Sequence, residues 1–109
     1  MNDLPDDEDC RGAPPDFPGC AVRDMTIVNR KGLHARATAK FVQCVERFGK
    51  AEVFVHRCGE TVGGMSIMGI LTLGAGMGST IQVAAKGEEA EAALDAIGAL
   101  VAARFGEDE

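Results

Sequence analysis

The chain has no tryptophan and no tyrosine, and its aromatic residues are five phenylalanines among 109 residues. Proteins that bind single-stranded nucleic acid stack the bases on aromatic side chains, so this composition argues against that class. No apolar run approaches the roughly 20 residues that a membrane-spanning helix needs. The first residues are acidic, which is not the pattern of a secretory signal. We therefore expect a cytoplasmic protein that neither binds nucleic acid nor inserts into a membrane.

The sequence also lacks the common signatures of metal and nucleotide sites. Its four cysteines form no Cys-x-x-Cys pair and have no metal-ligand spacing with either histidine. Its glycines build neither a G-x-x-x-x-G-K-[ST] nor a G-x-G-x-x-G signature. We expect no metal and no cofactor. A chain of this length forms one domain with a modest core, which favours a function carried by a surface site over a large catalytic cavity.

Charge is unevenly distributed along the chain, whose net charge is −6. Residues 1–21 hold six acids against one base, residues 22–57 hold eight bases against three acids, and the remainder is acidic. The basic stretch suits an acidic protein partner or a phosphoryl group, and it is too short for a nucleic-acid footprint. Residues 1–20 contain all four prolines and few large apolar side chains. We expect a disordered acidic tail there, followed by a domain over residues 21–109.

The hydrophobic pattern predicts four strands and three helices in the order β-α-β-β-α-β-α. Strands are expected over residues 22–28, 51–56, 61–62 and 80–84, and helices over residues 35–48, 67–73 and 88–105. This order suits an α+β fold in which one four-stranded antiparallel sheet carries three helices on one face.

One of the two histidines has the surroundings of a chemical site. His34 follows Gly32, which permits a sharp turn, and it opens a helix that carries Arg36. The first backbone N–H groups of a helix have no partners within the helix, and its dipole favours anions there. A phosphoryl group on the imidazole would find those donors and the guanidinium within reach. The alternative is that His34 is only a polar residue at a helix start. The other histidine, His56, lies at the end of a strand and is interpreted as structural.

Two blocks of sequence resemble the HPr family of histidine-containing phosphocarrier proteins. Residues 32–36 (Gly-Leu-His-Ala-Arg) resemble its active-site signature. Residues 65–69 (Met-Ser-Ile-Met-Gly), followed by Leu-Thr-Leu-Gly at 71–74, resemble its regulatory serine region. The two blocks lie at a separation close to that of the family, and the resemblance extends from about residue 22 to residue 105.

The resemblance implies an open-faced β-sandwich and a relay protein that is not an enzyme. It implies that His34 accepts a phosphoryl group from Enzyme I of a phosphoenolpyruvate-dependent phosphotransferase system and passes it to a IIA-type protein. Arg36 would steady the phosphate. Ser66 would be a regulatory phosphorylation site for an HPr kinase/phosphorylase. We expect a monomer.

Two positions depart from the family pattern. Ala37 stands where many members have proline, and the nitrogen-related branch resembles this sequence better in that respect. Met65 stands where a lysine commonly precedes the serine. For Ser66 the alternative is a helix N-cap, worth about 1 kcal/mol of helix stability. For the protein two alternatives stay open. One is a regulatory binding module that acts through Ser66, and the other is a small hydrolase, for which no motif places a nucleophile.

Overall fold

The computed structural model describes residues 17–109, which form a single four-stranded antiparallel sheet with helices. The strand order is β1-β4-β2-β3, so the strand that comes last in the chain lies between β1 and β2. The elements, in chain order, are β1 (Ala21–Thr26), α2 (Ala35–Glu46), β2 (Glu52–Arg57), β3 (Glu60–Gly63), α3 (Ile67–Thr72), β4 (Thr80–Lys86), α4 (Ala90–Ala102) and a 3-10 turn, η1 (Arg104–Gly106).

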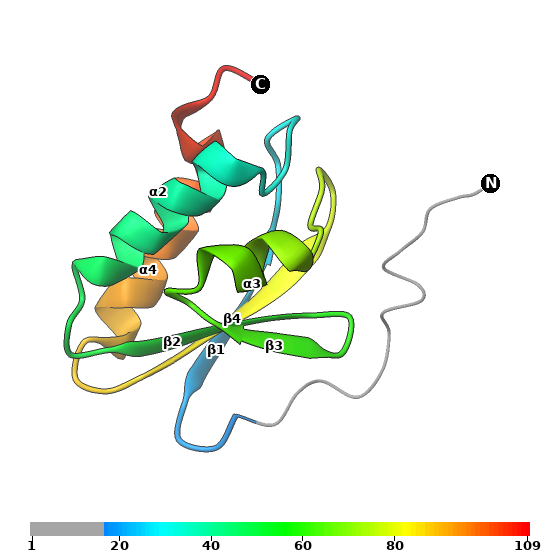
Figure 1. Cartoon of the computed structure of the whole chain (residues 1–109). Coiled ribbons are helices and arrows are strands. Elements are labelled where there is room, and N and C mark those ends of the chain that lie inside the picture. The colour runs from blue at the N-terminus through cyan, green and yellow to red at the C-terminus, as the bar shows by residue number, and fades with distance from the viewer. Residues whose placement is uncertain (1–16) are drawn as a thin grey trace.

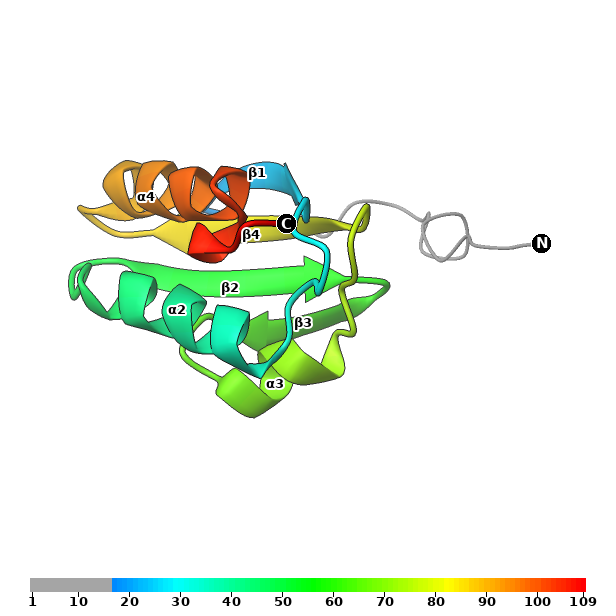
Figure 2. The same cartoon turned by 90° about the horizontal axis from the view of Figure 1, so that it is seen from above.

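The three α-helices cover one face of the sheet, and the described residues place no helix on the other face (Figures 1 and 2). Seen from above, α4 runs along β1 and β4, α2 lies beside β2, and α3 lies beside β3 (Figure 2). The expected α+β fold, with four antiparallel strands and three helices on one face, is confirmed.

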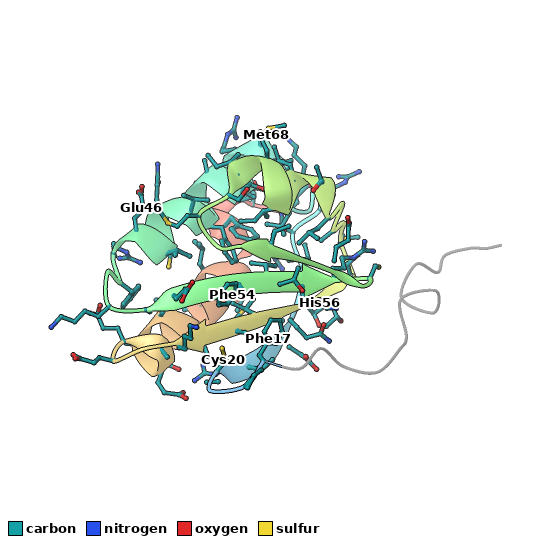
Figure 3. The ribbon with its side chains drawn as sticks, turned by 60° about the horizontal axis from the view of Figure 1, so that its bottom comes forward. Phe17, Cys20, Glu46, Phe54, His56 and Met68 are labelled. Carbon is teal, nitrogen blue, oxygen red and sulfur yellow. The ribbon has the colours of Figure 1, made fainter. Side chains whose placement is uncertain are left out.

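The alternation of side chains along β2 explains how the sheet separates its two faces. Val53 and Val55 are buried beneath the helices, whereas Phe54 and His56 are half-buried on the opposite face. There Phe17 stacks on Phe54 with ring centroids 6.3 Å apart and meets the His56 ring edge-on at 6.3 Å (Figure 3). His56 Nδ1 also lies 2.7 Å from the hydroxyl of Thr61 on the paired strand. His56 is thus a structural residue, as its sequence context indicated.

Helix α2 buries a stripe of apolar side chains against the sheet. Ala37 and Phe41 are fully buried, and Val45 is almost so, at steps of four residues along one face. Arg36, Gln43 and Glu46 lie on the exposed side of the helix, whereas Thr38 is buried with the apolar stripe. This packing fixes the N-terminal end of α2 relative to the sheet, and that end carries the candidate site.

The C-terminal segment differs from the sequence prediction, which continued the last helix to residue 105. Helix α4 ends at Ala102, and Arg104, Phe105 and Gly106 have φ of 60°, 54° and 78°. Two successive non-glycine residues in the left-handed region are unusual, and burial accounts for them, since Phe105 has no exposed surface. The chain turns back so that Phe105 enters the core, and the residues after it reach the start of α2 (Figure 1).

The acidic segment expected to be disordered falls mainly on residues 1–16, which lie outside the described residues. The boundary of the domain at residue 21 therefore stays a prediction.

Candidate functional site

His34 is the N-cap residue of α2, as the sequence predicted. Its backbone is extended (φ −80°, ψ −177°), and its carbonyl oxygen accepts the first helical hydrogen bond, from Thr38 N–H at 2.8 Å. Its side chain makes no capping hydrogen bond. The imidazole therefore does not cap the helix, and 26% of the His34 side chain is exposed.

Gly32 holds the loop before His34 in a conformation that other residues would not adopt easily. Its φ is +68°, and a β-carbon there would lie 2.6 Å from the carbonyl oxygen of Ala75. That same oxygen accepts a hydrogen bond from Leu33 N–H at 2.9 Å. The loop that presents His34 is thus locked against the loop that follows α3.

The structure adds two residues to the site that sequence reasoning did not find. His34 Nε2 lies 2.6 Å from Glu107 Oε2, and Glu107 Oε1 accepts a hydrogen bond from the Asn29 amide at 2.9 Å. The Asn29 amide also donates to the carbonyl oxygen of Gly32 at 2.9 Å, and its side chain is fully buried. Glu107 joins the site from 73 positions further along the chain, so no local spacing could have revealed it. Asn29 lies five residues before His34, but nothing in its neighbourhood distinguishes it from a turn residue.

The carboxyl group of Glu107 is stabilised in its charged form. The hydrogen bond from Asn29, and after it the one shared with His34, lower the pKa of this carboxyl below its ordinary value of 4.5. The positive charge of Lys31 acts in the same direction. A carboxylate therefore faces the His34 ring at neutral pH.

A shallow depression of about 480 Å³ lies beside the start of α2. The eight residues that line it are four cations and the last four residues of the chain: Arg30, Lys31, Arg36, Lys40, Gly106, Glu107, Asp108 and Glu109. Arg30 pairs with Glu109 at 2.6 Å, whereas Arg36 and Lys31 make no ion pair with any residue between 17 and 109. The depression therefore offers positive charge to an anion, including that of Arg36, which the sequence singled out.

Ser66 is the N-cap of α3, and its hydroxyl oxygen accepts a hydrogen bond from Gly69 N–H at 3.0 Å. Three apolar side chains stand exposed around it: Met65, Ile67 and Met68, with 52%, 42% and 71% of their surface accessible. We call these three the α3 patch. Ile70, the fourth apolar residue of the block, is fully buried. The N-cap interpretation of Ser66 is confirmed, and within residues 17–109 no hydrogen bond or ion pair joins it to His34.

Among the helices formed by residues 17–109, none combines the length and the apolar character needed to cross a membrane.

Comparison with known proteins identifies the family. The family model described as "PTS HPr component phosphorylation site" matches residues 21–103. The chain belongs to the HPr family. It is 47% identical over 87 residues to the phosphocarrier protein HPr of Cupriavidus necator, a match that covers 80% of this chain and 97% of that protein. It is 45% identical over 85 residues to the phosphocarrier protein NPr of Shewanella violacea, covering 78% of this chain and 92% of that one.

Solved structures of HPr proteins share the fold. HPr-C-His from Thermoanaerobacter tengcongensis superposes with a TM-score of 0.77 at 35% identity, covering 82% of this chain and 99% of that one. The HPr of Bacillus anthracis gives a TM-score of 0.71 at 40% identity, covering 75% and 96%. The chain is thus an HPr-type phosphocarrier of the phosphotransferase system, with both HPr and NPr proteins among its relatives. The family resemblance and the open-faced sandwich expected from the sequence are confirmed.

Proposed function

We propose that His34 carries the phosphoryl group, receives it from Enzyme I and passes it to a IIA-type protein. The observation that carries this proposal is the position of His34 at the N-terminus of α2, beside a depression in which Arg36 and Lys31 form no ion pair with any described residue. A phosphoryl group is the anion that such a site would hold for transfer.

The chemistry follows from the local structure. A neutral imidazole is nucleophilic near physiological pH, and the resulting phosphoramidate passes its phosphoryl group on readily. The N–H groups of the first turn of α2 point towards the helix start without partners in the helix, and the helix dipole adds positive potential there. Arg36, exposed in this first turn, supplies a planar cation that matches phosphate oxygens. The phosphoryl group can then be accepted and released at the surface without a cavity. The protein acts as a carrier between larger partners.

The surface around the site suits acidic partners in the cytoplasm. The basic side chains of the depression surround the start of α2, and the α3 patch offers an apolar surface of adaptable methionines. We infer that Enzyme I and the IIA-type acceptor bind successively over this part of the molecule, since both must reach His34.

A second part of the proposal concerns Ser66. We infer that a kinase of the HPr kinase/phosphorylase type phosphorylates this exposed residue. The modification would add a charge of about −1.5 to −2 beside the α3 patch while remaining compatible with the helix N-terminus. Binding to an acidic partner would then weaken. Phosphorylation of Ser66 would in this way regulate the same carrier protein, without any second activity of the chain.

Phosphoryl transfer from Enzyme I tests the first part. The protein is incubated with Enzyme I and labelled phosphoenolpyruvate, and the bound label is tested for stability in acid and in base. We expect an acid-labile, base-stable label that is absent in His34→Ala and unchanged in His56→Ala, the matched control on the other side of the sheet. An unlabelled wild-type protein with its cognate Enzyme I contradicts the proposal.

Labelling by ATP and a kinase tests the second part. We expect an acid-stable label on the wild-type protein that disappears in Ser66→Ala and persists in His34→Ala. A label that persists in Ser66→Ala contradicts the assignment of this residue, whatever the result at His34.

A further inference from the structure

The carboxylate of Glu107 lies against His34 because the C-terminal segment around it is fixed by contacts on both sides of Glu107. Phe105 is fully buried, and its carbonyl oxygen accepts a hydrogen bond from Lys40 Nζ at 2.6 Å. Two residues beyond Glu107, the Arg30 guanidinium pairs with the Glu109 carboxylate at 2.6 Å, and Arg30 N–H donates to the main-chain oxygen of Glu109 at 2.9 Å. Contacts at residues 105 and 109 thus fix the backbone on either side of Glu107.

The same carboxylate is oriented by a second side chain. Asn29 is fully buried, and its amide is fixed by donating to the Gly32 carbonyl oxygen at 2.9 Å as well as to Glu107 Oε1. One oxygen of Glu107 therefore faces Asn29 and the other faces His34 Nε2 at 2.6 Å. Only 14% of the Glu107 side chain is exposed, against 26% for His34, so both groups are partly shielded from water.

This arrangement determines which nitrogen of the ring can attack. A carboxylate can only accept, so the hydrogen bond places the ring proton on Nε2. The lone pair of the neutral ring then lies on Nδ1, which has no hydrogen bond to any residue in the described part of the chain. The lowered pKa of Glu107 keeps the carboxylate charged throughout the physiological range.

We propose that Glu107 is a positioning residue for phosphoryl transfer, which holds the His34 ring in the Nε2–H form and neutralises the positive charge that develops on the ring. This inference rests on the proposed function of His34 as the carrier. Residue 107 lies outside the stretch matched by the family model, residues 21–103, so the role comes from the geometry of this chain.

The Nδ1 lone pair forms the new N–P bond while the bond between phosphorus and the donor atom of phosphorylated Enzyme I breaks, and its electron pair leaves with the donor. The proton stays on Nε2, so the phosphorylated ring carries a positive charge that faces the Glu107 carboxylate. On transfer to the acceptor the N–P bond breaks, its pair returns to Nδ1, and the ring becomes neutral with its proton still on Nε2.

Rates of phosphorylation by Enzyme I test the proposal on the full chain. In Glu107→Ala we expect kcat to fall about tenfold, the size of the effect of losing one charge-assisted hydrogen bond, with KM for the protein changed much less. Glu107→Asp should recover part of the loss, and Glu107→Gln should stay slow because the amide is neutral. Glu46→Gln, which removes the same charge at the far end of α2, is the control and should transfer at the wild-type rate (Figure 3).

A spectroscopic readout separates positioning from folding. Nitrogen NMR of the His34 ring should show a proton on Nε2 that exchanges slowly with water in the wild-type protein and rapidly in Glu107→Ala, while the remaining amide spectrum is preserved. A Glu107→Ala variant that transfers at the wild-type rate, or faster, overturns the proposal. If the wild-type protein takes no phosphoryl group at all, the carrier function fails instead, and the NMR result still reports the hydrogen bond.

Discussion

Lys40 Nζ donates a hydrogen bond to the carbonyl oxygen of Phe105 at 2.6 Å, and this bond joins the second turn of α2 to the turn that follows α4. Phe105 itself is fully buried although its backbone lies in the left-handed region, with φ of 54°. The apolar ring and the ammonium group thus hold the C-terminal segment from two sides. The residues that follow are placed at the site by contacts that are largely independent of it.

The burial of Phe105 predicts a large loss of stability on truncation. Phe105→Ala should lower the free energy of unfolding by about 3–5 kcal/mol, because it removes a fully buried ring and leaves a cavity. Urea denaturation followed by circular dichroism measures this. Met77→Ala, at a side chain that is 63% exposed, should change the same quantity by less than about 0.5 kcal/mol. A similar loss in both variants would contradict the packing described.

The conformation of Gly32 predicts that alanine is not tolerated there. In Gly32→Ala the new β-carbon would meet the Ala75 carbonyl oxygen and the Gly76 α-carbon at 2.6 and 2.7 Å, so one of the two loops must move. We expect a loss of more than about 1 kcal/mol of stability and slower phosphorylation of His34. Gly49→Ala, where no atom lies within 4 Å of the new carbon and φ is not positive, should leave both measurements unchanged.

The N-cap at Ser66 allows its structural and regulatory roles to be separated. Ser66→Ala should destabilise the protein by about 1 kcal/mol, because the Gly69 N–H loses its acceptor. Ser66→Asp retains an acceptor and should keep most of that stability, but it places a negative charge beside the α3 patch. Thermal denaturation measures the first effect, and titration with Enzyme I measures the second. Wild-type affinity in Ser66→Asp would argue against regulation through charge at this residue.

Arg36 should matter for transfer and not for folding. It is exposed and makes no ion pair with any described residue, so Arg36→Ala should leave the urea midpoint nearly unchanged. The rate of phosphorylation by Enzyme I should fall about 10- to 100-fold, since a charge-assisted contact to the phosphoryl oxygens is lost. Arg47→Ala, at the C-cap of the same helix, removes the same charge away from the site and serves as the control.

The contact of Glu107 predicts a pH dependence of stability. Its pKa is lower in the folded protein than its ordinary value of 4.5, chiefly because Asn29 donates to the charged form. The contribution is therefore fully present above pH 4.5 and is lost as the pH falls through the lower, folded-state value. The difference in unfolding free energy between wild type and Glu107→Gln should shrink as the pH falls below about 4.5, because the carboxylate of Glu107 takes up a proton there. A difference that grows as the pH falls below 4.5 would contradict the assignment. The titratable ring of His34 and the positive charge of Lys31 are the groups that face this carboxylate.

The periodic parts of the fold could be predicted from the sequence, and the site only in part. The stripe of α2 and the alternation of β2 show a regular burial pattern, so their positions were correct within two residues at each end. His34 and Ser66 could be placed because each stands directly before a helix. Glu107 could not be predicted, since its contact depends on a turn that reverses the chain after Ala102. The left-handed backbone of Phe105 arises from burial in the tertiary structure, which local propensity does not encode.

The strand order β1-β4-β2-β3 also determines the order in which the strands can pair while the chain is being synthesised. The strand at residues 80–86 is the shared partner of β1 and β2, and the register joins Ala21 to Ala85 across 64 positions. A chain leaving the ribosome from its N-terminus can form the local β2–β3 hairpin early, but β1 has no neighbour until three quarters of the protein has been made. Because pairing between such distant segments is slow, we expect the sheet to be completed cooperatively and only late in the synthesis of the chain.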